Sequence, residues 1–172
     1  MRIIKKKKIT DANANVNLVS LIVSSFFLTG FIPIASGTFG SLAALSVFLI
    51  KDFSKPEILI PSIILAVLSG IYTSKSMMKK YGDDPSVVVI DEVAGMWITV
   101  LVFIVLSDKA PDLIYYFILF IAFRFFDIVK LQPAKYFDRM KSSAGVVMDD
   151  VISGIYAGVI VYLFSLTKII NL

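Results

Sequence analysis

The sequence predicts an all-α protein, a polytopic bundle of membrane-spanning helices. Hydrophobic residues make up 58% of the 172 residues and charged residues only 17%, and the mean hydropathy is +0.86. A soluble domain of this length has too much surface to hide so many apolar side chains. Apolar runs of membrane length also recur along the whole chain. We therefore expect one membrane-embedded domain over residues 18–172, after a basic, polar cytosolic segment at residues 1–17.

Six apolar segments can be read from the sequence. They are Leu18–Ile34, Ser41–Ile50, Ile58–Tyr72, Val87–Leu106, Leu113–Val129 and Val146–Leu166. The last three are long enough to span a bilayer as helices, whereas Ile58–Tyr72 is slightly short and Ser41–Ile50 must continue through Phe53. The pattern predicts about five spans and an N-terminal re-entrant or interfacial segment.

Basic residues cluster in the short loops on one side of these spans. The clusters are Lys5–Lys8, then Lys75, Lys79 and Lys80, and finally Lys130, Lys135, Arg139 and Lys141. The positive-inside rule places these loops in the cytosol and the C-terminus outside. If Ser41–Phe53 crosses, Leu18–Ile34 must begin and end inside, and Gly30 and Pro33 suit a break near its end. In the alternative, Leu18–Ile34 crosses and Ser41–Ile50 does not.

Cysteine and histidine are both absent from this sequence, which narrows its chemistry. A zinc site of the Cys/His type, a cysteine nucleophile and a histidine general base are all excluded. An enzyme of this composition must use carboxylates, hydroxyls, basic side chains and an added metal. Because the basic residues lie between apolar spans, we expect them to meet anionic lipid headgroups and no nucleic acid.

Carboxylates gather at the cytosolic ends of three predicted spans. Asp91 and Glu92 lie in the first turns of one span, Asp127 in the last turn of another, and Asp149 and Asp150 in the first turn of the third. Five carboxylates at one depth repel each other, and a charge at the bilayer centre costs roughly 2.5–3.5 kcal/mol. A hard divalent cation with oxygen ligands compensates this charge, and Mg²⁺ is the natural candidate.

Helical spacing directs these carboxylates toward other helices. Asp91 heads a narrow face of small residues that continues through Gly95 and Thr99 at i+4 and i+8. Asp150 heads a similar face through the Gly154–Gly158 pattern, a GxxxG motif typical of close helix contact. The helix dipole explains a single first-turn acid equally well. The convergence of carboxylates from three helices at one depth favours a metal-binding site over this explanation.

Two further features suit phosphate binding. Arg124 and Lys130 share a face with Asp127 and would bind a phosphate or neutralise the carboxylates. The stretch Gly37-Thr-Phe-Gly-Ser41 lies between two apolar segments, where glycines let backbone N–H groups turn toward an anion at a helix start. A plain turn explains that stretch equally well.

These residues resemble the phosphatidylglycerophosphatase A family from about Ser36 to the last span. The matching stretches are Gly37–Ser41, Asp84–Trp97, Phe123–Lys130, Pro133, Phe137–Arg139 and Gly145–Asp150. One departure is Lys130-Leu-Gln-Pro133, where the family tends to show Lys-Pro-x-Pro. The resemblance implies a Mg²⁺-dependent phosphatase of the inner, cytoplasmic membrane that faces the cytosol and converts phosphatidylglycerophosphate to phosphatidylglycerol.

The combined hypothesis assigns three groups of residues. The catalytic residues are Asp91, Glu92, Asp127 and Asp150. The metal ligands are Asp84, Asp91, Glu92, Asp127, Asp149 and Asp150. The phosphate-binding residues are Gly37, Thr38, Gly40, Ser41, Arg124 and Lys130.

Two other function classes compete with this hypothesis. A cation-coupled transporter or channel subunit also carries intramembrane acids, but it predicts carboxylates spread through the membrane depth. A lipid-synthesising phosphotransferase also uses Mg²⁺ and aspartates, but its usual Asp-Gly-x-x-Ala-Arg signature is missing, since no Asp-Gly occurs in the chain.

Overall fold

The computed structural model describes residues 9–167, which form seven α-helices, two 3₁₀ segments and no strand. In chain order these are α1 (Leu18–Ser24), η1 (Thr29–Phe31), α2 (Ser36–Ser46), η2 (Val47–Leu49), α3 (Pro56–Tyr81), α4 (Ile90–Ser107), α5 (Leu113–Val129), α6 (Ala134–Asp138) and α7 (Ser143–Leu166). The all-α prediction is confirmed. The basic cluster Lys5–Lys8 lies outside the described residues.

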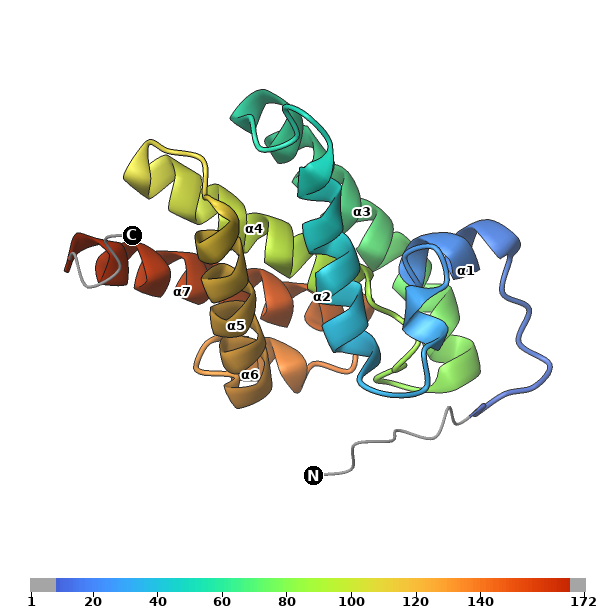
Figure 1. Ribbon diagram of the computed structural model, residues 1–172. Helices are drawn as coiled ribbons and strands as arrows, with labels where there is room; N and C mark the ends of the chain where they lie inside the picture. Colours follow the sequence, from blue (N-terminus) through green and yellow to red (C-terminus); the bar gives the residue numbers. More distant parts are fainter. Residues whose placement is uncertain (1–8, 168–172) are drawn as a thin grey trace.

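Helix α4 is the centre of the bundle. It contacts α2, α3, α5 and α7, and α2 and α5 cross in front of it in Figure 1. Its sequence is apolar on nearly every side, which is typical of a helix enclosed by others. The indole of Trp97 is buried and donates a hydrogen bond to the carbonyl of Ala44 on α2, at 3.0 Å.

Glycines let α4 and α7 cross at close range. A Cβ atom at Gly154 would lie 2.4 Å from the carbonyl oxygen of Gly95, and one at Gly158 would lie 2.7 Å from that of Thr99. The backbones therefore touch, as small residues on facing helices allow. The faces headed by Asp91 and Asp150 are confirmed as helix contacts.

Within residues 9–167, three helices are long and apolar enough to cross a membrane, namely α3 (26 residues), α4 (18 residues) and α7 (24 residues). Helix α5 coincides with the predicted segment Leu113–Val129, and its 17 residues reach the lower limit for a span. The piece Ser36–Leu49 is too short for a hydrocarbon core of about 30 Å. A total of five spans stays a prediction.

The N-terminal segment departs from its predicted form. Helix α1 ends at Ser24, and Phe26, Phe27 and Leu28 follow with φ of 41°, 55° and 71°. The helix thus ends before the predicted break near Gly30 and Pro33, because the chain already turns at Phe26, and a second bend follows at Pro33 and Ile34. A backbone hydrogen bond of 2.8 Å from Val89 to the Ser24 carbonyl ties this turn to the segment before α4. Whether the segment is re-entrant stays a prediction.

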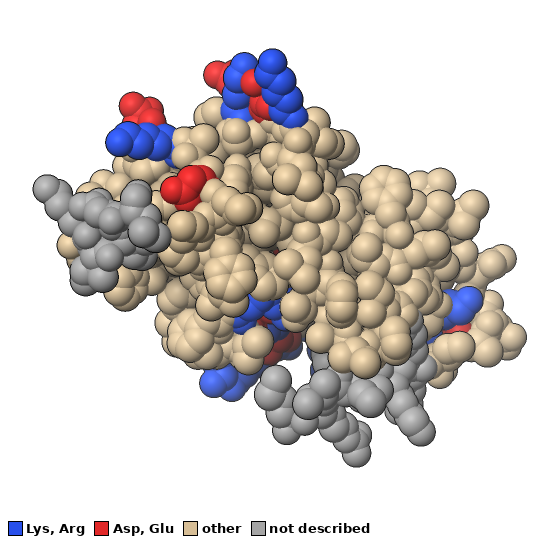
Figure 2. All heavy atoms as spheres, in the orientation of Figure 1, with Lys and Arg blue, Asp and Glu red and all other residues tan. Residues whose placement is uncertain are grey.

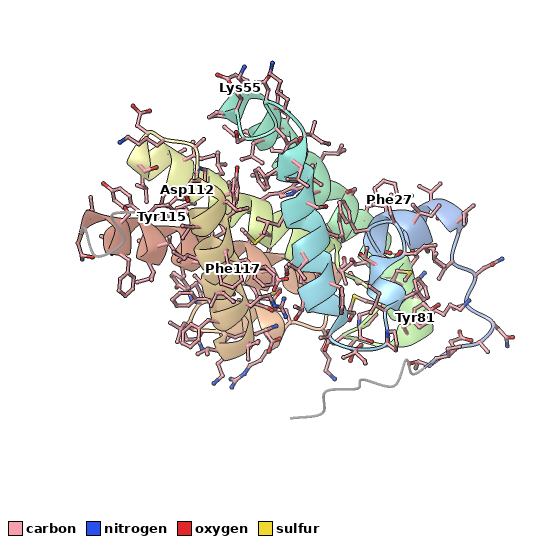
Figure 3. The ribbon with its side chains drawn as sticks, viewed as in Figure 1. Phe27, Lys55, Tyr81, Asp112, Tyr115 and Phe117 are labelled. Atoms are coloured by element: carbon pink, nitrogen blue, oxygen red, sulfur yellow. The ribbon has the colours of Figure 1, made fainter. Side chains whose placement is uncertain are left out.

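Charged side chains gather at opposite ends of the bundle. Lys55 and Asp112 lie at the upper end in Figure 3, away from α6. On the face shown in Figure 2, the charged groups at the top are separated by uncharged surface from a recess of mixed charge lower down. This arrangement suits a bundle whose middle lies in lipid.

Candidate active site

A polar cavity of about 770 Å³ opens at one end of the bundle. Helices α4 and α7 begin at this cavity and α5 ends there, while the start of α2 and the loops around α6 complete its walls. It is lined by all six carboxylates predicted as metal ligands, which are Asp84, Asp91, Glu92, Asp127, Asp149 and Asp150. The aspartates at 91, 127, 149 and 150 are only 3–9% exposed. The predicted convergence of three helices is therefore present.

Asp91, Glu92 and Asp150 form the tightest group, called here the acidic triad. One oxygen from each carboxylate lies within 4.8 Å of the others. Asp91 and Glu92 occupy the first turn of α4, whereas Asp150 lies in the second turn of α7, because that helix begins at Ser143. The close crossing of α4 and α7 brings these residues together.

The donor atoms of the site fit a hard divalent cation. Among the described residues, the buried oxygens Glu92 Oε2 and Asp149 Oδ1 have no hydrogen-bond partner. Such orphaned polar atoms are costly unless an ion or water satisfies them. The eight carboxylates that line the cavity also outnumber its three cations that form ion pairs with them. An oxygen-only, acidic donor set is what Mg²⁺ prefers.

Arg124 pairs with Asp127 on its own helix α5 and connects α5 to α2. Its Nη1 lies 2.8 Å from Asp127 Oδ2 and donates a longer hydrogen bond, 3.3 Å, to Ser41 Oγ. A Cβ atom at Gly37 would lie 2.2 Å from Glu92 Oε1 and 3.2 Å from the Arg124 guanidinium. Glycine at position 37 therefore lets the first turn of α2 approach both charged groups.

Lys130 bridges two carboxylates beyond the end of α5. Its ammonium donates to Asp149 on α7 and, at 2.6 Å, to Asp138 on α6. Burial by itself lowers the pKa of Lys130, but the negative charges of Asp149 and Asp138 outweigh burial and raise the pKa above its ordinary value. Lys130 is therefore charged at neutral pH and fixes α6 against α7.

The predicted phosphate motif at residues 37–41 is only partly in the cavity. The stretch is not a loop, because α2 already begins at Ser36, whose hydroxyl donates to the Ser86 carbonyl at 2.6 Å. Gly37 and Thr38, in the first turn, line the cavity, as do Arg124 and Lys130. Gly40 packs against Val89 instead. Ser41 is buried outside the cavity lining, where its hydroxyl accepts from Arg124 and donates to the Gly37 carbonyl at 2.8 Å.

Several cavity residues were missed by the sequence reasoning. Asp138 pairs with Lys130, and the Lys141 ammonium lies 3.3 Å from the Asp83 carboxylate of the α3–α4 loop. Arg139, which lies between Asp138 and Lys141 in the sequence, also lines the cavity. Helix α6 has five residues, too few to show a hydrophobic period. The available signal is the stretch Phe137–Arg139, which matches the family but receives no role from the sequence.

A family model and two curated relatives indicate one family. The family model described as Phosphatidylglycerophosphatase A matches residues 22–165. A phosphatidylglycerophosphatase A from Escherichia coli (strain K12) is 30% identical over 138 residues, or 79% of this chain and 77% of the relative. Another from Haemophilus influenzae is 38% identical over 142 residues, or 79% and 82%. A Bacteroides thetaiotaomicron protein provisionally named phosphatidylinositol-3-phosphatase is 31% identical over 152 residues, or 84% and 92%. No solved structure matches the chain significantly.

Proposed function

This chain belongs to the phosphatidylglycerophosphatase A family. We propose that it is a Mg²⁺-dependent hydrolase of phosphatidylglycerophosphate. Membership makes the chain a lipid phosphatase of the phosphatidylglycerophosphatase type. The main observation in favour of Mg²⁺-dependent hydrolysis is the acidic triad, which lies in a polar cavity at one end of apolar helices. The products are phosphatidylglycerol and phosphate.

The acidic triad would hold the Mg²⁺, and Asp127, Asp149 and Asp84, which line the same cavity, are the further candidate ligands. When bound, Mg²⁺ neutralises the charge of the phosphate and polarises its oxygens. The orphaned oxygens of Glu92 and Asp149 support this role, since a bound cation would satisfy buried oxygens that no protein group engages.

The side chains of the cavity bind the phosphate and transfer protons in this proposal. Arg124, together with backbone N–H groups of Gly37 and Thr38 at the start of α2, binds the terminal phosphate and stabilises charge that grows in the transition state. Lys130 adds positive charge from the other side. One carboxylate accepts a proton from water as the water oxygen attacks phosphorus. The P–O ester bond breaks, and the leaving glycerol oxygen takes up a proton.

The cavity meets its substrate at a membrane surface in this proposal. The ends of α4, α5 and α7 reach the cavity together, while exposed apolar side chains cover the helices away from it. The acyl tails can thus remain in the bilayer while the headgroup enters. The proposal puts this face on the cytosolic side of the inner membrane, next to anionic headgroups, and the basic residues of the α5–α7 connection support that orientation.

The transporter hypothesis gains no support. It requires carboxylates along the membrane depth, whereas the buried ones lie together at a single end of the bundle. The curated relatives carry phosphatase names.

Phosphate release from three lipids tests the headgroup. With the full chain purified in detergent, we expect kcat/KM for phosphatidylglycerophosphate to exceed that for phosphatidylinositol 3-phosphate and for phosphatidic acid by at least about tenfold, a difference of roughly 1.4 kcal/mol in transition-state binding. Mass spectrometry should identify phosphatidylglycerol as the lipid product. Faster release from the inositol lipid would overturn the substrate assignment but not the enzyme class.

A further inference from the structure

The polar cavity contains a cationic side chain that its carboxylates do not engage. Four basic residues line it, namely Arg124, Lys130, Arg139 and Lys141. Three of them form ion pairs, with Asp127, with Asp138 and Asp149, and with Asp83. Among the described residues, Arg139 alone lines the cavity without an ion-pair partner. Its guanidinium is therefore available to an anion that enters from outside.

Arg139 is held in a fixed place relative to the carboxylates of α7. It follows α6 directly, and the segment around it packs on the start of α7. A Cβ atom at Gly145 would lie 2.5 Å from the carbonyl oxygen of Met140 and 2.7 Å from that of Phe137. The Lys130 bridge fastens α6 to α7 a second time. The backbone at Arg139 therefore lies between two such attachments, and its exposed side chain extends from a fixed point of the cavity wall.

The surroundings of Arg139 are exposed and partly apolar, which suits a position at the membrane surface. Leu131, Tyr136 and Met140 expose apolar surface beside it, with 47%, 60% and 37% of each residue exposed. Figure 1 shows α6 at the ends of α5 and α7, close to the foot of the bundle. Apolar side chains next to basic ones are typical of the membrane interface.

We propose that Arg139 binds the phosphodiester of the lipid headgroup while the terminal phosphate occupies the acidic part of the cavity. This inference rests on the proposed function, because phosphatidylglycerophosphate carries a diester and a terminal monoester separated by one glycerol. The planar guanidinium can donate two parallel hydrogen bonds to the two free oxygens of a diester. Lys141, two residues further on, adds positive charge at the mouth of the cavity. The cavity thereby selects lipids with two phosphates.

Variants at Arg139 test this assignment on the full chain in mixed micelles. We expect Arg139→Ala to lower kcat/KM for phosphatidylglycerophosphate roughly 10- to 100-fold, the usual loss for a hydrogen-bonded charge pair, and Arg139→Lys to lose less. The inhibition constant of inorganic phosphate should change less than twofold, because that ion needs only the inner part of the cavity. Lys135→Ala is the matched control, since Lys135 is an exposed cation on α6 outside the cavity lining. We expect it to leave both values unchanged.

Three results would overturn the role of Arg139 while leaving the proposed function intact. They are unchanged kcat/KM in Arg139→Ala, an equal loss in Lys135→Ala, and a parallel weakening of phosphate inhibition. Absence of phosphate release by the unmodified chain would instead defeat the proposed function itself, and the role of Arg139 with it. Thermal unfolding of each variant separates loss of binding from loss of fold.

Discussion

Asp91→Asn is expected to lower kcat/KM for phosphate release by about 100- to 1000-fold, the range seen when one preorganised charge-stabilising group is removed from an active site. The substitution keeps the shape of the side chain but takes one negative charge from the acidic triad, whose oxygens lie within 4.8 Å of one another. Metal affinity and charge stabilisation should fall together. Phosphate release by purified protein measures the loss, and the yield from membranes shows that insertion is intact.

Asp108→Asn is the matched control for this variant. Asp108 caps the opposite end of the same helix with φ of 56°, a conformation that asparagine tolerates as well as aspartate. Its activity should equal that of the unmodified chain. Asp127→Asn should behave like Asp91→Asn, because it leaves Arg124 without its ion-pair partner at 2.8 Å. Full activity in both site variants would refute the assignment of the site.

Gly154→Ala is expected to destabilise the bundle by about 1–3 kcal/mol, as overpacking of a well-packed core does. The added methyl would lie 2.4 Å from the Gly95 carbonyl oxygen, and backbone on both helices cannot give way as a side chain can. The same crossing sets the position of Asp150 against Asp91, so activity should fall as well. Unfolding in mixed detergent, followed by circular dichroism, measures the first effect.

Gly70→Ala controls for the loss of a helical glycine. A methyl at Gly70 would meet only side-chain carbons of Ile90 and Val147, at 3.2 and 3.3 Å, and these can shift. Alanine also favours a helix over glycine by about 1 kcal/mol. We expect this variant to unfold within about 1 kcal/mol of the unmodified chain. Equal destabilisation of the two variants would contradict the special role of the α4–α7 crossing.

The parts of the fold that depend on capping residues, apolar runs and helical spacing could be predicted from the sequence. Helix α5 has its predicted bounds because Asp112 caps its first turn with a hydrogen bond of 2.8 Å to the Tyr115 amide, and an apolar run fills the rest. The acidic triad was also predictable, since Asp91 and Asp150 each head a face of small residues in sequence. Helical spacing alone directs such faces toward each other.

The parts that depend on distant contacts could not be predicted. Nothing in the apolar run from Leu18 to Leu28 signals a stop, yet the chain leaves the helix after Ser24 and bonds to Val89, more than sixty residues away. The rim of the cavity was missed for a similar reason. Arg139 acquires its position from Gly145 and Lys130, and only the fold places these contacts around the short helix α6.

The most direct test of the central claim is phosphate release from phosphatidylglycerophosphate by the detergent-purified full chain, first with Mg²⁺ and then with EDTA. The acidic triad and the orphaned carboxylate oxygens predict turnover with Mg²⁺, near-complete loss in EDTA and recovery when Mg²⁺ is restored. Equal release in EDTA would contradict the metal-dependent site. No release under either condition, from well-folded protein, would contradict the phosphatase function itself.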